Sequence, residues 1–218
     1  MSLSPVLRQV ERLVALGVHE RAGLSAQELR GAAAALSTGG DERSVLALDP
    51  ALAPASVLAP LMSRAARPGF IVVDMTDVDE FAPLDTVAVP ESPVYLVRSP
   101  DRGDEMANWS PHEALPAILA AGRTPLLLTE GITWVLQQPE ILQPGTCFMT
   151  IGSRLRRPGG RLDARTPALW ISGGTGRDGV ARRGAPKVGW CWAGNRHTWL
   201  GFASGAGRVG APAPADRA

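Results

Sequence analysis

The sequence predicts an α+β protein in which N-terminal helices pack on a mainly antiparallel sheet, with a C-terminal β-meander. Two parts of the chain with different apolar patterns predict this fold class. Residues 1–69 are rich in alanine and place apolar side chains at helical spacing, whereas the chain from Thr146 onward consists of short apolar runs separated by Gly, Pro or Arg. With 218 residues, 45% of them hydrophobic, the chain is long enough to bury one sizeable core.

Three helices are predicted near the N-terminus. The first has apolar residues at helical spacing and ends before Gly17. The second begins at Ser25, because Glu28 three residues later completes a capping box, and it runs to about Ser37. The third covers about residues 56–66, with a kink or a late start at its internal proline.

Two further helices are predicted in the middle of the chain. Ser110 is the clearest helix start in the sequence, since proline and then Glu113 follow at the first and third helical positions. We expect that helix to end at Gly122. Thr129 is the predicted cap of the other helix, which ends before Pro139.

Six short runs rich in branched or aromatic residues predict strands. They are residues 70–74, 94–97, 147–151, 168–172, 188–192 and 198–203. The last four predict the antiparallel meander. We therefore expect three parts: a helical N-terminal segment (1–69), an α+β core domain (70–205) and a low-complexity, flexible tail (206–218).

Charge and hydropathy exclude several classes of partner. The net charge of +1 lacks the basic excess of a nucleic-acid-binding protein, and no apolar run approaches the roughly 20 residues needed to cross a membrane. The N-terminus has charged residues among its apolar positions, unlike a secretory signal, which predicts a cytoplasmic protein. In that compartment we expect Cys147 and Cys191 to be free thiols. Nothing in the sequence indicates the oligomeric state.

The tryptophan-rich segment from Gly189 to Gly201 is the most distinctive feature. Gly194-Asn195 between two strand-like runs predicts a two-residue hairpin turn. In that register one face carries a cluster of aromatic side chains and the other face carries Cys191, which disfavours a cysteine–histidine nucleophile pair. The predicted cluster consists of Trp190, Trp192, His197 and Trp199.

The function predicted from this face is the binding of a small-molecule ligand. Indoles offer flat apolar surfaces, His197 can exchange a proton near neutral pH, and Asn195 and Trp170 complete the predicted binding residues. One alternative is an enzyme of specialised small-molecule metabolism with His197 as catalytic general acid or base. A second is a protein-interaction module. Cross-strand aromatic packing that only stabilises a hairpin also explains these residues.

Other motifs carry less information. His112-Glu113 lacks the second histidine of a zinc-protease motif, and the cysteines and histidines show no metal-ligand spacing, so no metal site is predicted. Whether the protein uses a cofactor is unknown from the sequence. A cluster of arginines is interpreted as ordinary surface residues, with an anionic ligand or an acidic partner as the alternative. It comprises Arg154, Arg156, Arg157, Arg161 and Arg165.

The segment from Lys187 to Gly201 reads Lys-Val-Gly-Trp-Cys-Trp-Ala-Gly-Asn-Arg-His-Thr-Trp-Leu-Gly. Together with residues 72–79, 122–126 and 167–171, it resembles a family of proteins from high-GC bacteria that is known only as a domain of unknown function. The resemblance covers roughly residues 70–205 and supports treating them as one unit. Because that family has no assigned reaction, the resemblance implies no catalytic residue.

Overall fold

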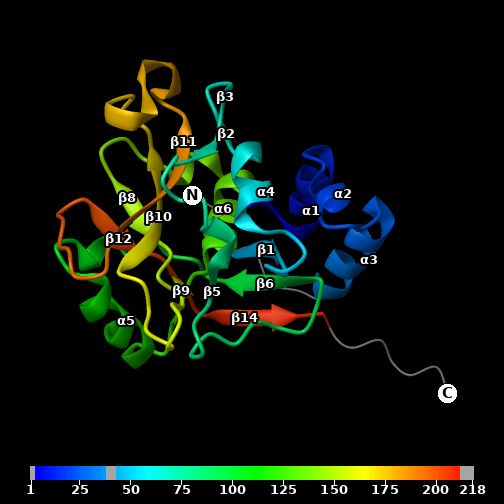
Figure 1. The fold of residues 1–218 in the computed structure, drawn as a ribbon. Coiled ribbons are helices and arrows are strands. Elements are labelled where there is room, and N and C mark those ends of the chain that lie inside the picture. Colours follow the sequence, from blue (N-terminus) through cyan, green and yellow to red (C-terminus); the bar gives the residue numbers. More distant parts are fainter. Residues whose placement is uncertain (1–2, 38–42, 212–218) are drawn as a thin grey trace.

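The structure, a computed structural model, describes residues 3–37 and 43–211 and has the predicted α+β architecture. A three-stranded sheet has the order β1-β6-β14, and a five-stranded sheet has the order β12-β8-β10-β11-β4. Figure 1 shows the N-terminal helices beside the first sheet, on the side away from the second. The N-terminal helices are α1 (Val6–Ala15), α2 (Val18–Arg21) and α3 (Ala26–Leu36).

The first two predicted helices are confirmed, and the capping box at Ser25 is present. The Ser25 hydroxyl accepts a hydrogen bond from the Glu28 N–H at 3.1 Å, and the Glu28 carboxylate accepts one from the Ser25 N–H at 2.7 Å. These two contacts satisfy N–H groups that the start of a helix leaves free. Local sequence therefore determines where α3 begins.

Strand β1 (Ser44–Leu48) lies within the segment predicted to be helical. All five of its residues are buried, so it lacks the alternating pattern by which a strand is recognised. It pairs antiparallel with β6 (Val94–Arg98), a predicted strand that is confirmed. The Gln9 side chain of α1 donates to the Ser44 carbonyl at 2.7 Å and accepts from the Leu46 N–H at 2.9 Å, which ties this sheet to the helices.

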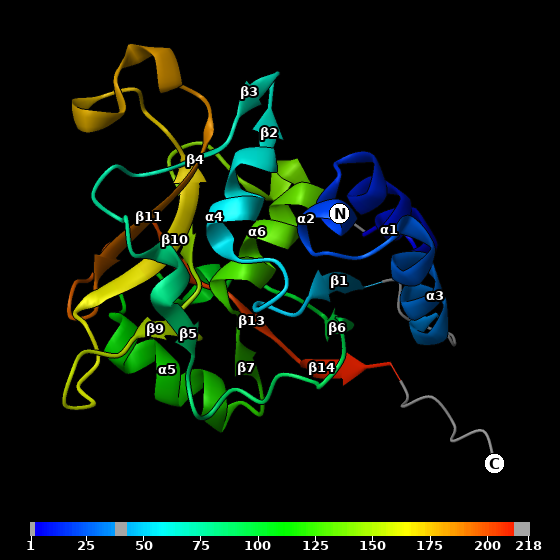
Figure 2. The ribbon, with the colours of Figure 1, turned by 45° about the vertical axis from the view of Figure 1, so that its right-hand side comes forward.

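The predicted third helix at 56–66 is too long. Helix α4 (Ala55–Leu58) and the turn η1 (Ala59–Leu61) replace it, and the two-residue strands β2 (Ser63–Arg64) and β3 (Arg67–Pro68) follow. Proline inside η1 interrupts the regular hydrogen bonding of a helix. Figure 2 shows β2 and β3 projecting from the body of the protein as a hairpin.

The chain after residue 205 returns to the three-stranded sheet. Strand β14 (Gly207–Gly210) pairs antiparallel with β6, so the predicted flexible tail begins too early at residue 206. Arg208 of this strand is buried in an ion pair with Glu130. Residues 212–218 of the predicted tail lie outside the described residues.

The five-stranded sheet contains the predicted C-terminal strands. Its members are β4 (Phe70–Ile71), β8 (Cys147–Met149), β10 (Arg165–Ile171), β11 (Pro186–Trp192) and β12 (Leu200–Phe202). Strands β8 and β11 pair antiparallel with β10 on its two sides, as a meander requires. Strand β12 instead pairs with β8, in parallel. The predicted hairpin between Trp190 and Trp199 is therefore wrong, because two strands lie between β11 and β12.

Helix α6 (Leu128–Gln137) lies between the two sheets in both ribbon views. All its residues from 128 to 136 are buried, as expected of a helix covered on every side. Gly131 allows its close approach to the five-stranded sheet, since a Cβ there would lie 2.6 Å from Thr150 and 3.1 Å from Leu169. The helix ends where predicted but starts one residue before Thr129, the predicted cap.

Helix α5 (Pro111–Ala120) packs on the other face of the five-stranded sheet and has the predicted capping box at Ser110. The remaining elements are short: β5 (Phe81–Pro83), β7 (Thr124–Pro125), β9 (Ser153–Leu155), β13 (Ser204–Gly205), η2 (Val78–Glu80), η3 (Asp104–Met106), η4 (Pro139–Ile141), η5 (Gly176–Asp178) and η6 (Val180–Arg182). The main core contains buried side chains from both sides of residue 69. The predicted division between an N-terminal segment (1–69) and a core domain (70–205) therefore stays a prediction. Within the described residues, no helix has the length and apolarity to span a membrane.

Candidate functional site

The connection from β11 to β12, residues 193–199, crosses the face of the five-stranded sheet that α5 partly covers. Strands β11, β8 and β12 all run in one direction, because β8 and β11 are antiparallel to β10 and β12 is parallel to β8. The connection must therefore return to the opposite end of the sheet. Backbone bonds hold it there, from the Asn108 N–H to the His197 carbonyl at 2.9 Å and from the His112 N–H to the Ala193 carbonyl at 3.3 Å.

A cavity of about 340 Å³, which we call the tryptophan cavity, lies between this connection and the sheet. Four predicted site residues line it, namely Trp170, Trp190, His197 and Trp199. The others are Gly145, Thr146, Cys147, Ala168, Ile171, Cys191 and Leu200. The other two predicted residues are Trp192, at the end of β11, and Asn195, in the connection. Both are exposed, and neither lines the cavity.

Close packing fixes the Trp170 indole. Gly189 lies beneath it on the neighbouring strand, where a Cβ would come within 2.4 Å of the indole Cη2 atom. Only glycine leaves room there for an indole that lies across the strand. His197 stacks on Trp199 with ring centroids 4.7 Å apart and an angle of 25° between the planes. Trp190 contacts Trp192 edge-on, at 4.5 Å between centroids.

The predicted faces of the segment hold only in part. Trp190 packs against the main core on one side of the five-stranded sheet and Cys191 against a second cluster on the other side, so these two residues lie on opposite faces as predicted. Cys191 was expected on the face opposite His197, but both residues line the tryptophan cavity. The predicted hairpin register is wrong because β11 forms seven residue pairs with β10 and none with β12.

The two cysteines in the cavity are free thiols. Burial, and secondly the proximity of Cys191, raises the pKa of Cys147 to about 12. Burial also raises the pKa of Cys191, although a backbone bond of Trp192 and the Asn195 side chain oppose the shift. Because the thiolate is the nucleophile, neither cysteine is activated at neutral pH. A cysteine–histidine mechanism is disfavoured for this reason and not because of the strand register.

The comparisons with known proteins concern almost the whole chain. The model of a family of unknown function, DUF5701, matches residues 12–211. The chain belongs to this family. No curated protein and no solved structure matches it. The matched region begins well before residue 70, so the family includes most of the N-terminal helical segment as well as the cavity-bearing sheet.

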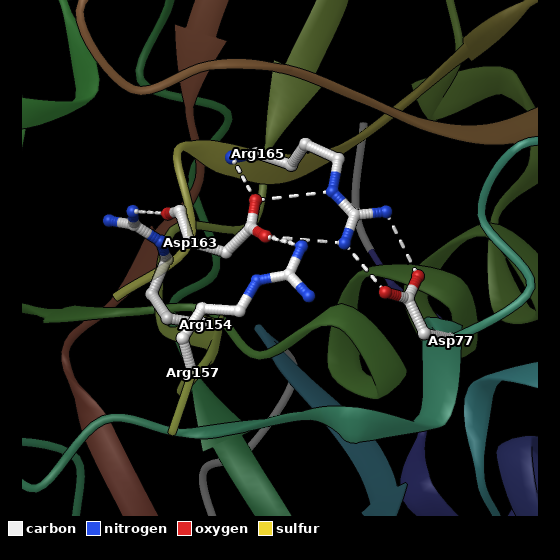
Figure 3. A network of polar contacts seen from close by, with 5 residues as sticks. All are labelled: Asp77, Arg154, Arg157, Asp163 and Arg165. Atoms are coloured by element: carbon white, nitrogen blue, oxygen red, sulfur yellow. Dashed lines mark hydrogen bonds and ion pairs between the residues drawn. The ribbon is translucent and has the colours of Figure 1, made fainter. Parts of the chain in front are cut away.

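The arginine cluster of this DUF5701 chain is largely paired within the protein (Figure 3). Arg165 donates to both oxygens of Asp77, at 3.0 and 2.6 Å, and to both oxygens of Asp163, at 3.1 and 3.4 Å. Arg157 pairs with Asp163, and Arg154 donates to the carbonyl of that residue at 2.6 Å. Arg154 and Arg165 are therefore not ordinary surface residues. The network could not be predicted from the sequence, because Asp77 lies 88 residues from Arg165.

Proposed function

We propose that this protein binds a small ligand with a flat, apolar body in the tryptophan cavity. The observation that carries the proposal is the convergence of Trp170, Trp190 and Trp199 on one cavity from β10, β11 and the connection between β11 and β12. The volume of about 340 Å³ lies in the range of small-molecule sites. Indole rings favour flat partners through stacking and edge contacts.

The other lining residues indicate a ligand body without charge. Most are apolar, and none of those described is an acidic residue, lysine or arginine. The His197 imidazole and the Thr146 hydroxyl are the polar side chains that can orient a ligand through hydrogen bonds. An apolar site with a few fixed polar groups is the usual composition of a small-molecule pocket.

Binding without catalysis is better supported than an enzyme. A catalytic histidine is usually oriented by a third group, often a carboxylate. Among the residues that the structure describes, no acidic side chain pairs with His197, and neither thiol in the cavity is activated. The cavity thus offers contact surface and hydrogen bonds, but no nucleophile activated by a base.

Replacing Trp199 with alanine tests the proposal. Indole is the probe, and its affinity is measured by isothermal titration calorimetry. We expect Trp199→Ala to weaken binding about tenfold, because it removes one aromatic wall. Trp199 is 52% exposed, so the substitution leaves the core intact.

Trp109→Ala is the matched control, since Trp109 is 40% exposed and does not line the tryptophan cavity. We expect it to bind indole as the wild type does. Equal losses in the two variants, or no binding of millimolar indole to the wild type, would count against the proposed function.

A further inference from the structure

A second cavity, of about 290 Å³, adjoins the tryptophan cavity and has a different character. Trp170 and Trp190 line both cavities. Beyond them the second cavity is bordered by the loop that carries η5, which projects beyond the ends of β10 and β11 in Figure 2. Its walls contain two cations and two anions, Lys187, Arg177, Asp74 and Asp178. We call it the charged cavity.

Lys187 is the only lysine in the chain, and it is held in a fixed position. Its ammonium lies 4.6 Å from the centroid of the Trp170 ring and 2.7 Å from Oδ2 of Asp178. Both side chains of this ion pair are largely buried, at 13% and 10% exposure. The cation–π contact places a positive charge against the same indole that forms a wall of the tryptophan cavity.

The charged cavity retains unused hydrogen-bonding groups of both signs. Asp178 Oδ2 accepts bonds from Lys187 and from the Ser172 hydroxyl, whereas Oδ1 has no partner among the described residues. Arg177 uses one nitrogen, Nη1, on Asp74 at 2.6 Å and is 73% exposed. The ammonium and the guanidinium can therefore bind a carboxylate while the aspartates accept bonds from an ammonium.

We propose that the ligand carries a zwitterionic head group, with an ammonium and a carboxylate, that binds in the charged cavity while its flat body lies in the tryptophan cavity. This inference rests on the proposed function. Two cations balanced by two anions favour a head group that is itself balanced, because a single net charge would meet repulsion from half of these side chains. The chemical class is thus an amino acid or a related amine with a flat apolar side chain.

Four probes with one common ring test the inference: indole, tryptamine, indole-3-propionate and tryptophan. They present no head group, a cation, an anion and a zwitterion. By calorimetry on the full chain we expect tryptophan to bind at least about tenfold more tightly than indole, with the other two in between. In Lys187→Met the ratio of tryptophan to indole affinity should fall to about one, whereas Arg161→Ala, at an exposed residue that lines neither cavity, should keep the wild-type ratio.

The outcomes separate the two proposals. Binding of indole without preference for tryptophan would overturn the zwitterion and leave the proposed function intact. Failure of all four probes would overturn both. If Lys187→Met does not fold because Asp178 loses its partner, the double variant Lys187→Met/Asp178→Asn removes that charge, and an unchanged ratio in it would overturn the inference.

Discussion

Replacing Arg208 with methionine is expected to lower the free energy of unfolding by about 3 to 5 kcal/mol, the usual cost of leaving one member of a buried ion pair alone. Glu130 is fully buried, and Arg208 bonds both of its oxygens, at 2.5 and 2.7 Å. Tyr95 donates a third bond to this carboxylate, at 2.9 Å. Burial, and then the charge of Glu130, raises the pKa of Tyr95 well above its usual value, so the phenol stays a donor.

Urea or guanidinium denaturation measures this effect, with Arg30→Met as the matched control. Arg30 also bonds both oxygens of a glutamate, Glu11, at 2.7 and 2.8 Å, but that pair is about half exposed. We expect the control to lower the free energy of unfolding far less, because solvent screens an exposed ion pair. The double variant Glu130→Gln/Arg208→Met should regain much of the loss, since no charge is left unpaired. If Arg208→Met and Arg30→Met lowered the free energy of unfolding equally, the burial of the Arg208–Glu130 pair would contribute nothing to stability.

Replacing Arg165 with leucine is expected to cost about 3 kcal/mol at neutral pH, because Asp77 and Asp163 both lose their main cation. Burial would raise the pKa of Asp163, but hydrogen bonds from Arg165 and Arg157 together outweigh burial and hold that pKa at about 2, below its ordinary 3.8. The hydrogen bond from Arg165 likewise lowers the pKa of Asp77.

A lowered carboxylate pKa stabilises the folded state above the ordinary pKa, and this contribution is lost as pH falls through the folded value. For Asp163, which is 8% exposed, the loss is on the order of 2 kcal/mol between about pH 4 and pH 2. The stability difference between wild type and Arg165→Leu should therefore narrow over that interval. A difference that stays constant from pH 6 to pH 2 would contradict this account. Arg156→Leu, which loses an exposed pair with Asp85, should change stability by less than about 1 kcal/mol.

Local signals in the sequence predicted the helix starts well. Ser25 and Ser110 cap helices because the interaction partner is three residues away, and such short-range chemistry depends little on the rest of the fold. Strand β1 was not predicted because both of its faces are buried, which removes the alternation of apolar and polar residues. The Gly194-Asn195 signal was misleading for a related reason. A turn sequence favours reversal of the chain, but the strand that β11 pairs with is decided by the longer contact with β10.

The candidate site likewise combines residues that the sequence predicted with contacts that depend on long-range strand pairing. Trp170, Trp190, Trp199 and His197 were predicted and line one cavity, although by a crossover connection and not by a hairpin. Cys147 was missed as a site residue because its place beside Trp170 depends on the pairing of β8 with β10. The ion pairs of Arg165 and Arg208 join residues 88 and 78 positions apart, and no local pattern in the sequence marks such partners.

The most direct test of the ligand cavity is a titration of ¹⁵N-labelled protein with indole, followed through the indole N–H resonances of its six tryptophans. Trp170, Trp190 and Trp199 line the cavity, whereas Trp134 is buried in the core and Trp109 is exposed elsewhere. We expect the resonances of the first three to shift saturably and those of Trp109 and Trp134 to stay in place. Larger shifts at Trp109 or Trp134, or no shift at any tryptophan, would contradict the assignment of the cavity as a ligand site.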